Sequence, residues 1–460
     1  MFNRQGFKEP RMANQNSDHS PFQSLRSFLV HLGEKGELIR ITREVSPKFE
    51  LAAVVKSIQD TVNKAVCFED VKGFNGTIAS NLCGSHRNIA LALSSDPNGL
   101  ATAWARKSEG FGAFDYESCS KSTIDLRRLR LNELPGIVFH EKDAGPYITS
   151  GIVLSKNPET GKVNLSFHRI QMTGTEELGI RLSPSGHLFA NQKICEDQGK
   201  PLECAILVGS SPLTMLSAAT TMSSFESELD LASHLLGKPW PLRKCHTVDL
   251  EVPEDTEIVL EGEILPHVRR TEGPFGEWMG FYVAPSPNHV FKVKDMFAQE
   301  RPIHYAIIAG SKEEIMLTVV PIAGSILRAV KTFVPSVIDV VCWPMPQFCV
   351  VKMKKRYQGE EHRALLAALG AELNRILYVV VVDEDVDIYN PSDVLWAIST
   401  RCRPDQDVFI VPGVPSFARD PFQRHWGRMG IDATVPFELT KEFERKKIPL
   451  PKDVNWEDYV

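Results

Sequence analysis

Apolar side chains recur at helical spacing near the start of the chain, on one face of a predicted helix that Gly33 ends. Further helical stretches alternate with short apolar runs, which predicts an α/β domain over residues 21–125. A polar leader over residues 1–20 precedes it, lacks the apolar stretch of a secretory signal, and is expected to be disordered. The apolar face of the first helix is Phe22, Leu25, Phe28, Leu29 and Leu32; further helices are predicted at 49–61 and 88–107, and strands at 38–42, 65–71 and 76–82.

The middle third of the chain has the period-two alternation of β-strands. Two β-rich runs surround a Pro/Gly turn within residues 147–172, which predicts a hairpin, and residues 249–265 and 289–297 alternate in the same way. A short helix is predicted at 227–237. Residues 126–310 are therefore predicted to form a β-sheet or barrel with inserted helices.

From residue 311 the chain returns to an α/β pattern, which predicts a third domain over residues 311–430. Three apolar, β-branched runs are of the kind found in buried parallel strands. Asn390 and Pro391 then supply the N-cap and first position of a helix. The tail, residues 431–460, ends in prolines and charges, and its composition leaves packing against a partner subunit open. The three strand-like runs are 337–343, 348–353 and 376–389, and the helix covers 392–400.

Composition is that of a soluble globular protein and narrows the range of partners. The chain has 460 residues, of which 43% are hydrophobic and 24% charged, with a net charge of −6. Without a basic block longer than 352–357, we expect no nucleic-acid partner. No apolar run reaches the ~18 residues of a membrane helix, so we expect no membrane association. Nine cysteines without a CxxC pair favour buried, reduced thiols in a cytoplasmic protein.

Several common catalytic motifs are missing from the sequence. There is no Walker loop, no GxGxxG and no GxSxG, so nucleotide-binding and serine-hydrolase chemistry lack support. The acidic run DEDVD (383–387) lacks the glycine and the glutamate that a calcium-binding EF-hand loop requires. It indicates an acidic turn after a buried strand.

The segment TEGPFGEW (271–278) holds Glu272 and Glu277 on either side of a Gly-Pro-Phe-Gly turn. Two carboxylates held close together and buried cannot both ionise comfortably, which would make one of them a proton donor near neutral pH. An exposed acidic turn is the commoner arrangement. The residues alone leave both alternatives open.

A second candidate is the strand at 163–171, which is unusually polar for its apolar flanks. Asn164, Ser166 and His168 would face one side of this strand, and Arg169 the other. An arginine on the apolar-looking face needs a buried anion. An edge strand, whose arginine reaches solvent, is the alternative.

A third candidate is a set of metal-type side chains, Asn164, His187 and Glu228. Their spacing is too wide for a local motif, and a lone histidine or glutamate is usually structural.

Taken together, these stretches resemble the UbiD family, the prenylated-flavin-dependent decarboxylases that include ferulic acid decarboxylase. The resemblance extends from about Phe22 to Arg403, and its motifs follow the family's order. The motifs are NLSFHRIQ (164–171), SGHLF (185–189), SELDLASHLLGKP (227–239), EGPFGE (272–277) and VVVVDEDVDIYNPSDVLWAISTR (379–401).

The resemblance implies an α/β (α+β) fold with an N-terminal α/β domain, a central split β-barrel that binds flavin, and a C-terminal α/β domain. It also implies a homodimer or a larger homo-oligomer. Asn164, His187 and Glu228 would hold Mn²⁺ or a similar divalent metal against the phosphate of prenylated FMN, with K⁺ beside Glu228. The residues expected to approach the flavin are Ser166, Ala218 and Met222.

The chain departs from the family pattern before the apolar strand that leads to the acidic signature. Many relatives carry a lysine there that meets the flavin phosphate, whereas this chain has LNRILYVVVV. Either Arg375 makes that contact, or the phosphate depends more on the metal.

The reaction implied is the non-oxidative, reversible decarboxylation of an aromatic or heteroaromatic carboxylic acid, through a covalent adduct with the cofactor. Arg169 would orient the substrate carboxylate, Glu272 would pair with Arg169, and Glu277 would deliver the proton that replaces CO₂. A flavin prenyltransferase would supply the cofactor.

Four alternatives to this function stay open. A cinnamic-type, α,β-unsaturated acid is an alternative substrate, and a catalytically silent flavin-binding homologue is an alternative to an active enzyme. A hydrolase could use Glu272 and Glu277 as acid and nucleophile, but this leaves Asn164, His187 and Glu228 unexplained. Carboxylation at high bicarbonate is the reverse of the expected reaction.

Overall fold

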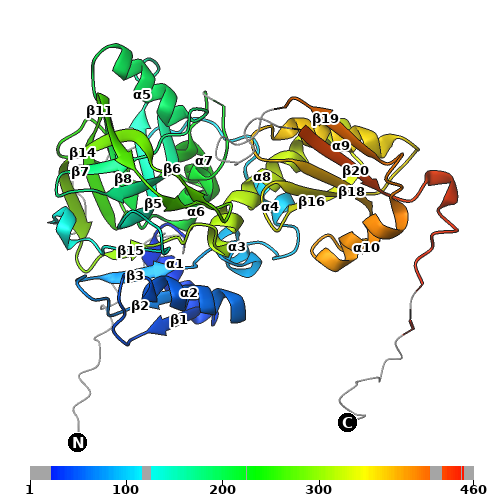
Figure 1. Ribbon diagram of the computed structural model, residues 1–460, viewed down its shortest axis with the longest axis horizontal. Coiled ribbons are helices and arrows are strands. Elements are labelled where there is room, and N and C mark those ends of the chain that lie inside the picture. Colours follow the sequence, from blue (N-terminus) through cyan, green and yellow to red (C-terminus); the bar gives the residue numbers. More distant parts are fainter. Residues whose placement is uncertain (1–21, 117–125, 224, 415–426, 447, 450–460) are drawn as a thin grey trace, which may run out of the picture. The chain divides into compact units, whose positions relative to one another are not determined.

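The structure is a computed structural model that describes residues 22–116, 126–223, 225–414, 427–446 and 448–449. The predicted leader and the last part of the predicted tail lie outside these residues. The chain divides into two compact units, Met1–Pro321 and Ile322–Val460. Both units combine helices with β-sheet, in agreement with the predicted α/β class (Figure 1).

A four-stranded sheet and four helices form the first part of the first unit. Helix α1 (Leu25–Glu34) begins at a capping box of Ser24 and Ser27 and buries four of the five apolar residues predicted for one face. Helix α2 (Glu50–Thr61) packs Leu51 and Val55 into a core shared with the sheet. The sheet order is β1 (Leu38–Ile41), β2 (Ala65–Phe68), β3 (Thr77–Ser80) and β15 (Ile303–Tyr305), so a segment far along the chain completes it.

The stretch 88–107, predicted as one helix, forms two. Helix α3 (His86–Leu93) ends where Ser94 adopts a left-handed φ of +48°, and α4 (Leu100–Lys107) begins after Gly99 at +87°. Pro97 lies between them and has no N–H to donate to a helix, so the break has a local cause.

A closed barrel of antiparallel strands forms the rest of the first unit. Its sheet has the order β11-β8-β5-β6-β7-β14-β4, and an additional pairing of β11 with β14 closes the ring. The predicted hairpin at 147–172 is confirmed as the antiparallel pair β5–β6. The strands are β4 (Leu126–Arg128), β5 (Tyr147–Lys156), β6 (Val163–Met172), β7 (Glu177–Ile180), β8 (Leu202–Val208), β11 (Ile258–Glu272) and β14 (Ser286–Gln299).

Apolar side chains from all sides of the ring meet in one core, which includes Ile148, Ile170, Ile206, Leu260 and Phe291. This packing fixes the strands whose polar residues form the candidate site. The inserted elements are η1 (Leu131–Glu133), α5 (His187–Asp197), α6 (Pro212–Ala218), α7 (Glu228–Leu236), β9 (Leu242–Lys244), β10 (Glu251–Pro253), β12 (Phe275–Gly276) and β13 (Tyr282–Val283).

The second unit contains a five-stranded sheet of order β16-β17-β18-β20-β19. The prediction of parallel strands is right for β17–β18 but wrong for β16–β17, which are antiparallel. Only 343–347 separate these two strands, and so short a connection permits a hairpin but no parallel crossover. The elements are β16 (Val337–Cys342), β17 (Phe348–Met353), α9 (Glu360–Ala371), β18 (Tyr378–Asp383), α10 (Pro391–Arg401), β19 (Val408–Pro412), β20 (Gly427–Ala433) and η2 (Phe437–Leu439).

Helix α8 (Lys312–Phe333) contains the boundary between the two units and was not anticipated from the sequence. By length and composition alone, this 22-residue helix, with an 18-residue window of mean hydropathy 1.5, could cross a membrane, whereas we expected no stretch of that kind. However, 61% of its apolar window is buried within the protein, as in the core helix of a folded domain.

No disulfide joins the cysteines that the structure describes. These eight residues are free thiols, and six of them are buried. Cys119 lies outside the described residues.

Candidate active site

Strand β6 presents two faces of different chemistry, as the alternation of its residues predicts. On one face Asn164 Nδ2 donates to Ser166 Oγ at 3.2 Å, and Ser166 Oγ lies 3.0 Å from His168 Nε2. Arg169 lies on the other face and is only 8% exposed. Because β6 pairs with β5 and β7, the edge-strand alternative is wrong.

Two glutamates from outside β6 bind the Arg169 guanidinium. Glu272 ends β11 and accepts from Arg169 Nε at 3.0 Å and from Nη2 at 2.7 Å, in a bidentate pair. Glu277 Oε1 accepts from Nη1 of the same arginine. Glu272 and Glu277 are 1% and 5% exposed, so they do not lie on an exposed acidic turn.

Two further side chains donate hydrogen bonds to Glu272. Besides the two bonds from Arg169, Glu272 Oε1 accepts from Tyr147 Oη at 3.0 Å, and its Oε2 accepts from Asn288 Nδ2 at 2.9 Å. Glu272 therefore accepts from four donor atoms, two of them on Arg169.

The turn between the glutamates sets their separation. Gly273 has a φ of +94°, a conformation that favours glycine, and it precedes Pro274. Phe275 then lies under Arg169, with the guanidinium carbon 4.8 Å from the ring centroid, and beside the Tyr147 ring at 4.5 Å. The buried ring thus holds both the arginine and the tyrosine that bind Glu272.

The charges around Arg169 keep its guanidinium protonated. Burial by itself would lower the pKa of Arg169, but the carboxylates of Glu277 and Glu272 outweigh it and raise that pKa. Burial raises the pKa of Tyr147 well above its ordinary value, and Glu272 adds to the shift. Arg169 therefore stays cationic and Tyr147 stays protonated at neutral pH.

Replacing Tyr147 with phenylalanine should destabilise the protein by about 1–2 kcal/mol, because Glu272 loses one of its buried donors. Turnover should fall several-fold, since Glu272 keeps its other donors. Denaturant unfolding of the apoprotein measures the first effect and steady-state kinetics the second. Tyr357→Phe is the control, because Tyr357 is 41% exposed and should change stability by less than about 0.5 kcal/mol. An unchanged stability in Tyr147→Phe would contradict the prediction.

Glu228 lies beside the polar face of β6. It begins α7, is 4% exposed, and accepts from the Leu165 backbone N–H at 2.9 Å. Burial raises the pKa of Glu228 to about 7. Within the described residues Glu228 forms no ion pair, so its buried carboxylate has no cation of its own. The Glu228 carboxylate therefore lies beside the backbone that joins Asn164 to Leu165.

The other predicted cofactor contacts are spread over neighbouring elements. His187 begins α5 and is half-buried, and no hydrogen bond joins it to Asn164 or Glu228 within the described residues. Ala218 ends α6 and is buried, and Met222 lies in the segment between α6 and α7. The structure thus brings Asn164, Ser166 and Glu228 together, and it shows no bond that would assign His187, Ala218 or Met222 to the same site.

Helix α6 also holds two buried hydroxyls that the sequence did not single out. Thr214 Oγ1 and Ser217 Oγ have no hydrogen-bond partner within the described residues. A bound ligand can satisfy such groups.

Arg375 belongs to the second unit, where it pairs with Glu372 at 3.7 Å. Its contact with the cofactor phosphate therefore stays a prediction.

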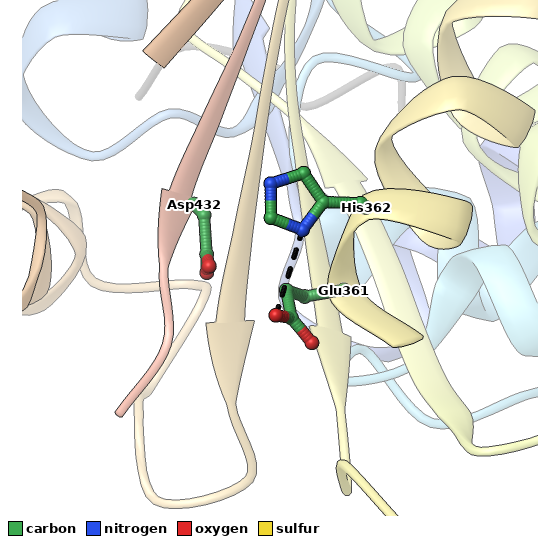
Figure 2. A group of neighbouring side chains, drawn as sticks. All are labelled: Glu361, His362 and Asp432. Atoms are coloured by element: carbon green, nitrogen blue, oxygen red, sulfur yellow. Dashed lines mark ion pairs between the residues drawn. The ribbon is translucent and has the colours of Figure 1, made fainter. Parts of the chain in front are cut away.

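A further group of metal-type side chains lies in the second unit. Ligand atoms of Glu361 and His362, at the start of α9, and of Asp432, on β20, all lie within 4.8 Å of one another (Figure 2). Lys355 Nζ lies 3.8 Å from Glu361 Oε2 and is almost fully buried. Glu361 also accepts from Gly359 N at 3.0 Å. Because a buried lysine already supplies the positive charge, we interpret this group as an internal ion-pair network.

Three family models cover most of the chain. They describe the N-terminal, Rift-related and C-terminal domains of 3-octaprenyl-4-hydroxybenzoate carboxy-lyase, and they match residues 29–107, 115–312 and 315–433. The chain belongs to the UbiD family and is a decarboxylase of the carboxy-lyase class.

Individual relatives agree over nearly the whole length. Anhydromevalonate phosphate decarboxylase of Methanothermobacter thermautotrophicus is 32% identical over 437 residues, which are 92% of this chain and 99% of that protein. The UbiD-class enzyme HmfF from Pelotomaculum thermopropionicum, solved with FMN, has a TM-score of 0.88 and 36% identity over 95% of this chain and 100% of that one. The 3,4-dihydroxybenzoic acid decarboxylase of Enterobacter cloacae has a TM-score of 0.87 and 26% identity, with 96% and 100% covered. A further HmfF structure contains prFMN.

Sequence reasoning missed Tyr147 and Asn288, which also donate hydrogen bonds to Glu272. Both carry ordinary polar side chains on strands, 125 and 16 residues from Glu272 in the chain. The one available signal is that Tyr147 opens a predicted strand beside NLSFHRIQ, on the same side of the hairpin as Arg169.

Proposed function

We propose that this protein uses prenylated FMN to decarboxylate an aromatic or heteroaromatic carboxylic acid, without net oxidation and reversibly. The observation that carries the proposal is the buried Arg169 bridging Glu272 and Glu277. This arrangement places the Arg169 cation between two buried carboxyl groups, and Glu272 also accepts from Tyr147 and Asn288.

The geometry supports a different role for each of these groups. Arg169 orients the carboxylate of the incoming acid, because a guanidinium binds a carboxylate through two parallel bonds. Glu272 is held by Tyr147 and Asn288, and its two bonds from Arg169 keep the guanidinium in place. Glu277 then delivers the proton that takes the place of CO₂, as a general acid.

The residues beside β6 fit the proposed cofactor and metal. Glu228 offers a buried carboxylate that no cation neutralises within the described residues, Asn164 an amide, and His187 an imidazole; this donor set suits Mn²⁺ against a phosphate. Prenylated FMN, when bound, supplies the electron sink that protein side chains lack. Potassium beside Glu228, and contacts to the flavin from Ser166, Ala218, Met222 and Arg375, belong to the same proposal.

Replacing Glu228 with alanine should abolish tight Mn²⁺ binding and reduce the flavin content of the purified protein. The buried carboxylate is the charged member of the donor set, so its loss leaves the metal without a charged protein ligand. Metal analysis and the flavin absorbance of the isolated protein measure the effect. Glu226→Ala is the control, because Glu226 is an exposed carboxylate on the same segment. Equal metal content in both variants would remove Glu228 from the metal site.

The proposed function is tested on protein produced together with a flavin prenyltransferase. Its absorbance and the mass of the released cofactor show whether prenylated FMN is bound, and CO₂ release from a panel of acids shows turnover. The panel includes furan, pyrrole, indole and phenolic acids, a cinnamic acid, and anhydromevalonate phosphate, which the name of a relative suggests. Protein produced without the prenyltransferase is the control and should be inactive.

Each result of this experiment has a distinct meaning. Turnover of an aromatic acid supports the proposal, and turnover of only the cinnamic acid or the phosphorylated acid moves the substrate to that class. Bound prenylated FMN with no turnover favours a silent homologue. A colourless protein contradicts the proposal.

Two further expectations belong to the same proposal. We expect a homodimer or a larger homo-oligomer, which light scattering of the purified protein measures. A cytoplasmic location is expected from the free thiols of the described cysteines.

A further inference from the structure

The loop at residues 140–147 (HEKDAGPY), here called the bracing loop, lies directly against the turn that carries Glu277. It leads into β5, whose first residue is Tyr147, the donor to Glu272. Ala144 N donates to Pro274 O at 2.9 Å. One loop thus contacts both the turn and one of the two glutamates.

Asp143 makes the most specific contact between the bracing loop and the turn. Its Oδ1 accepts from Gly276 N at 2.9 Å, and its Oδ2 accepts from His140 N at 2.9 Å. The Asp143 side chain is 0% exposed. A buried carboxylate thus joins two backbone amides, and one of them belongs to the residue immediately before Glu277.

Gly276 leaves no room between the turn and the bracing loop. A Cβ atom at this position would lie 2.7 Å from His140 Nδ1 and 2.9 Å from His140 Cγ. No side chain longer than that of glycine therefore fits unless His140 moves. The backbone that carries Glu277 is held from one side by the bond to Asp143 and by contact with the His140 ring.

We infer that Asp143 is a positioning residue for the proton donor, with Gly276 and His140 as the contact through which it acts. This inference rests on the proposed function, in which Glu277 protonates the product. Asp143 acts through the backbone of Gly276, to which its carboxylate is bonded. Without it, the turn can shift, and a displacement of about 1 Å at a catalytic group can cost on the order of 10² in rate.

The test compares Asp143→Ala and Asp143→Asn with the wild-type holoenzyme. Asp143→Ala should lower kcat about 10- to 100-fold and change KM less than about 3-fold, because the proton donor moves while substrate binding through Arg169 remains. Asp143→Asn should lose less, since its amide oxygen can still accept from Gly276 N. Glu141→Gln is the control, an exposed change in the same loop that should leave kcat unchanged.

A second pair of variants tests the contact itself. Gly276→Ala alone should lower kcat, because the added Cβ meets the His140 ring. Gly276→Ala combined with His140→Ala should recover much of that loss, because the space for the Cβ is then open. Independent, additive losses in the two single variants would contradict the inference.

Backbone hydrogen exchange of residues 271–281 gives a readout that does not depend on activity. In Asp143→Ala this segment should exchange faster than in the wild type, whereas the control should match the wild type. If the wild type decarboxylates no acid, the proposed function fails, and the exchange result alone decides whether Asp143 positions the turn. Unchanged exchange, or a kcat equal to that of the wild type in an active enzyme, overturns the inference.

Discussion

Glu277→Gln should lower kcat by about 10³-fold or more while prenylated FMN stays bound, because a general acid contributes about 10²–10⁴ in rate and glutamine has no proton to give. The substitution keeps the shape of the side chain and an oxygen that can accept from Arg169 Nη1. Binding of cofactor and substrate should therefore change little. Single-turnover measurements of CO₂ release and of product formation, made on protein with a full flavin spectrum, separate the loss of CO₂ from the protonation that follows.

The matched control is Glu263→Gln, on the same strand as Glu272. Glu263 pairs with Lys294 at 2.7 Å, away from Arg169, and its removal should leave kcat within about two-fold of the wild type. If Glu277→Gln retained wild-type turnover, the proton would have to come from another group. If the variant lost its flavin, Glu277 would have a structural role in the cofactor site.

How much of this site can be predicted from the sequence depends on how many consecutive residues each pattern involves. Asn164, Ser166 and His168 share a face because side chains alternate along any strand, and the structure joins them in one hydrogen-bonded row. Asn390 caps α10 through a bond to Ser392 N, as its position before a proline predicts. Signals of this kind need only a few consecutive residues.

Contacts that depend on pairing between distant segments of the chain could not be predicted from the sequence. The β11–β14 ladder closes the barrel, and no pattern within either strand specifies its partner. Asn288 reaches Glu272 only because that ladder places Glu272 opposite Ser286. The antiparallel β16–β17 pair was mispredicted because apolar, β-branched strands look alike in both orientations.

The resemblance to a family supplied what local patterns could not, namely that Arg169 and the two glutamates act together. The side-chain positions give this grouping a physical basis that the motifs lack. Glu272 accepts from four donor atoms of Arg169, Tyr147 and Asn288, and Glu277 accepts from Arg169 Nη1. Because the bidentate pair with Arg169 occupies both oxygens of Glu272, we propose Glu277 as the proton donor.

Arg169→Met should destabilise the apoprotein by about 3–5 kcal/mol and abolish turnover, because removing one partner of a buried ion pair leaves uncompensated charge. Arg169 pairs with both Glu272 and Glu277, and methionine fills a similar volume without a charge. The variant also loses the contact of the guanidinium with the Phe275 ring. Denaturant unfolding of the cofactor-free protein measures the change without a contribution from ligand binding.

Adding Glu272→Gln to Arg169→Met separates the effect of uncompensated charge on stability from the effect of lost packing. Glutamine at this position removes one of the two stranded carboxylates. Its amide oxygen can still accept from Asn288 Nδ2, and its NH₂ group can donate to Tyr147 Oη. The double variant should therefore be more stable than Arg169→Met alone, yet remain inactive, because no group then orients the substrate carboxylate. Arg169→Met with wild-type stability would mean that the carboxylates do not both carry charge in the resting protein. In that case Glu277 would already hold its proton before substrate binds, and Arg169 would serve the substrate rather than the fold.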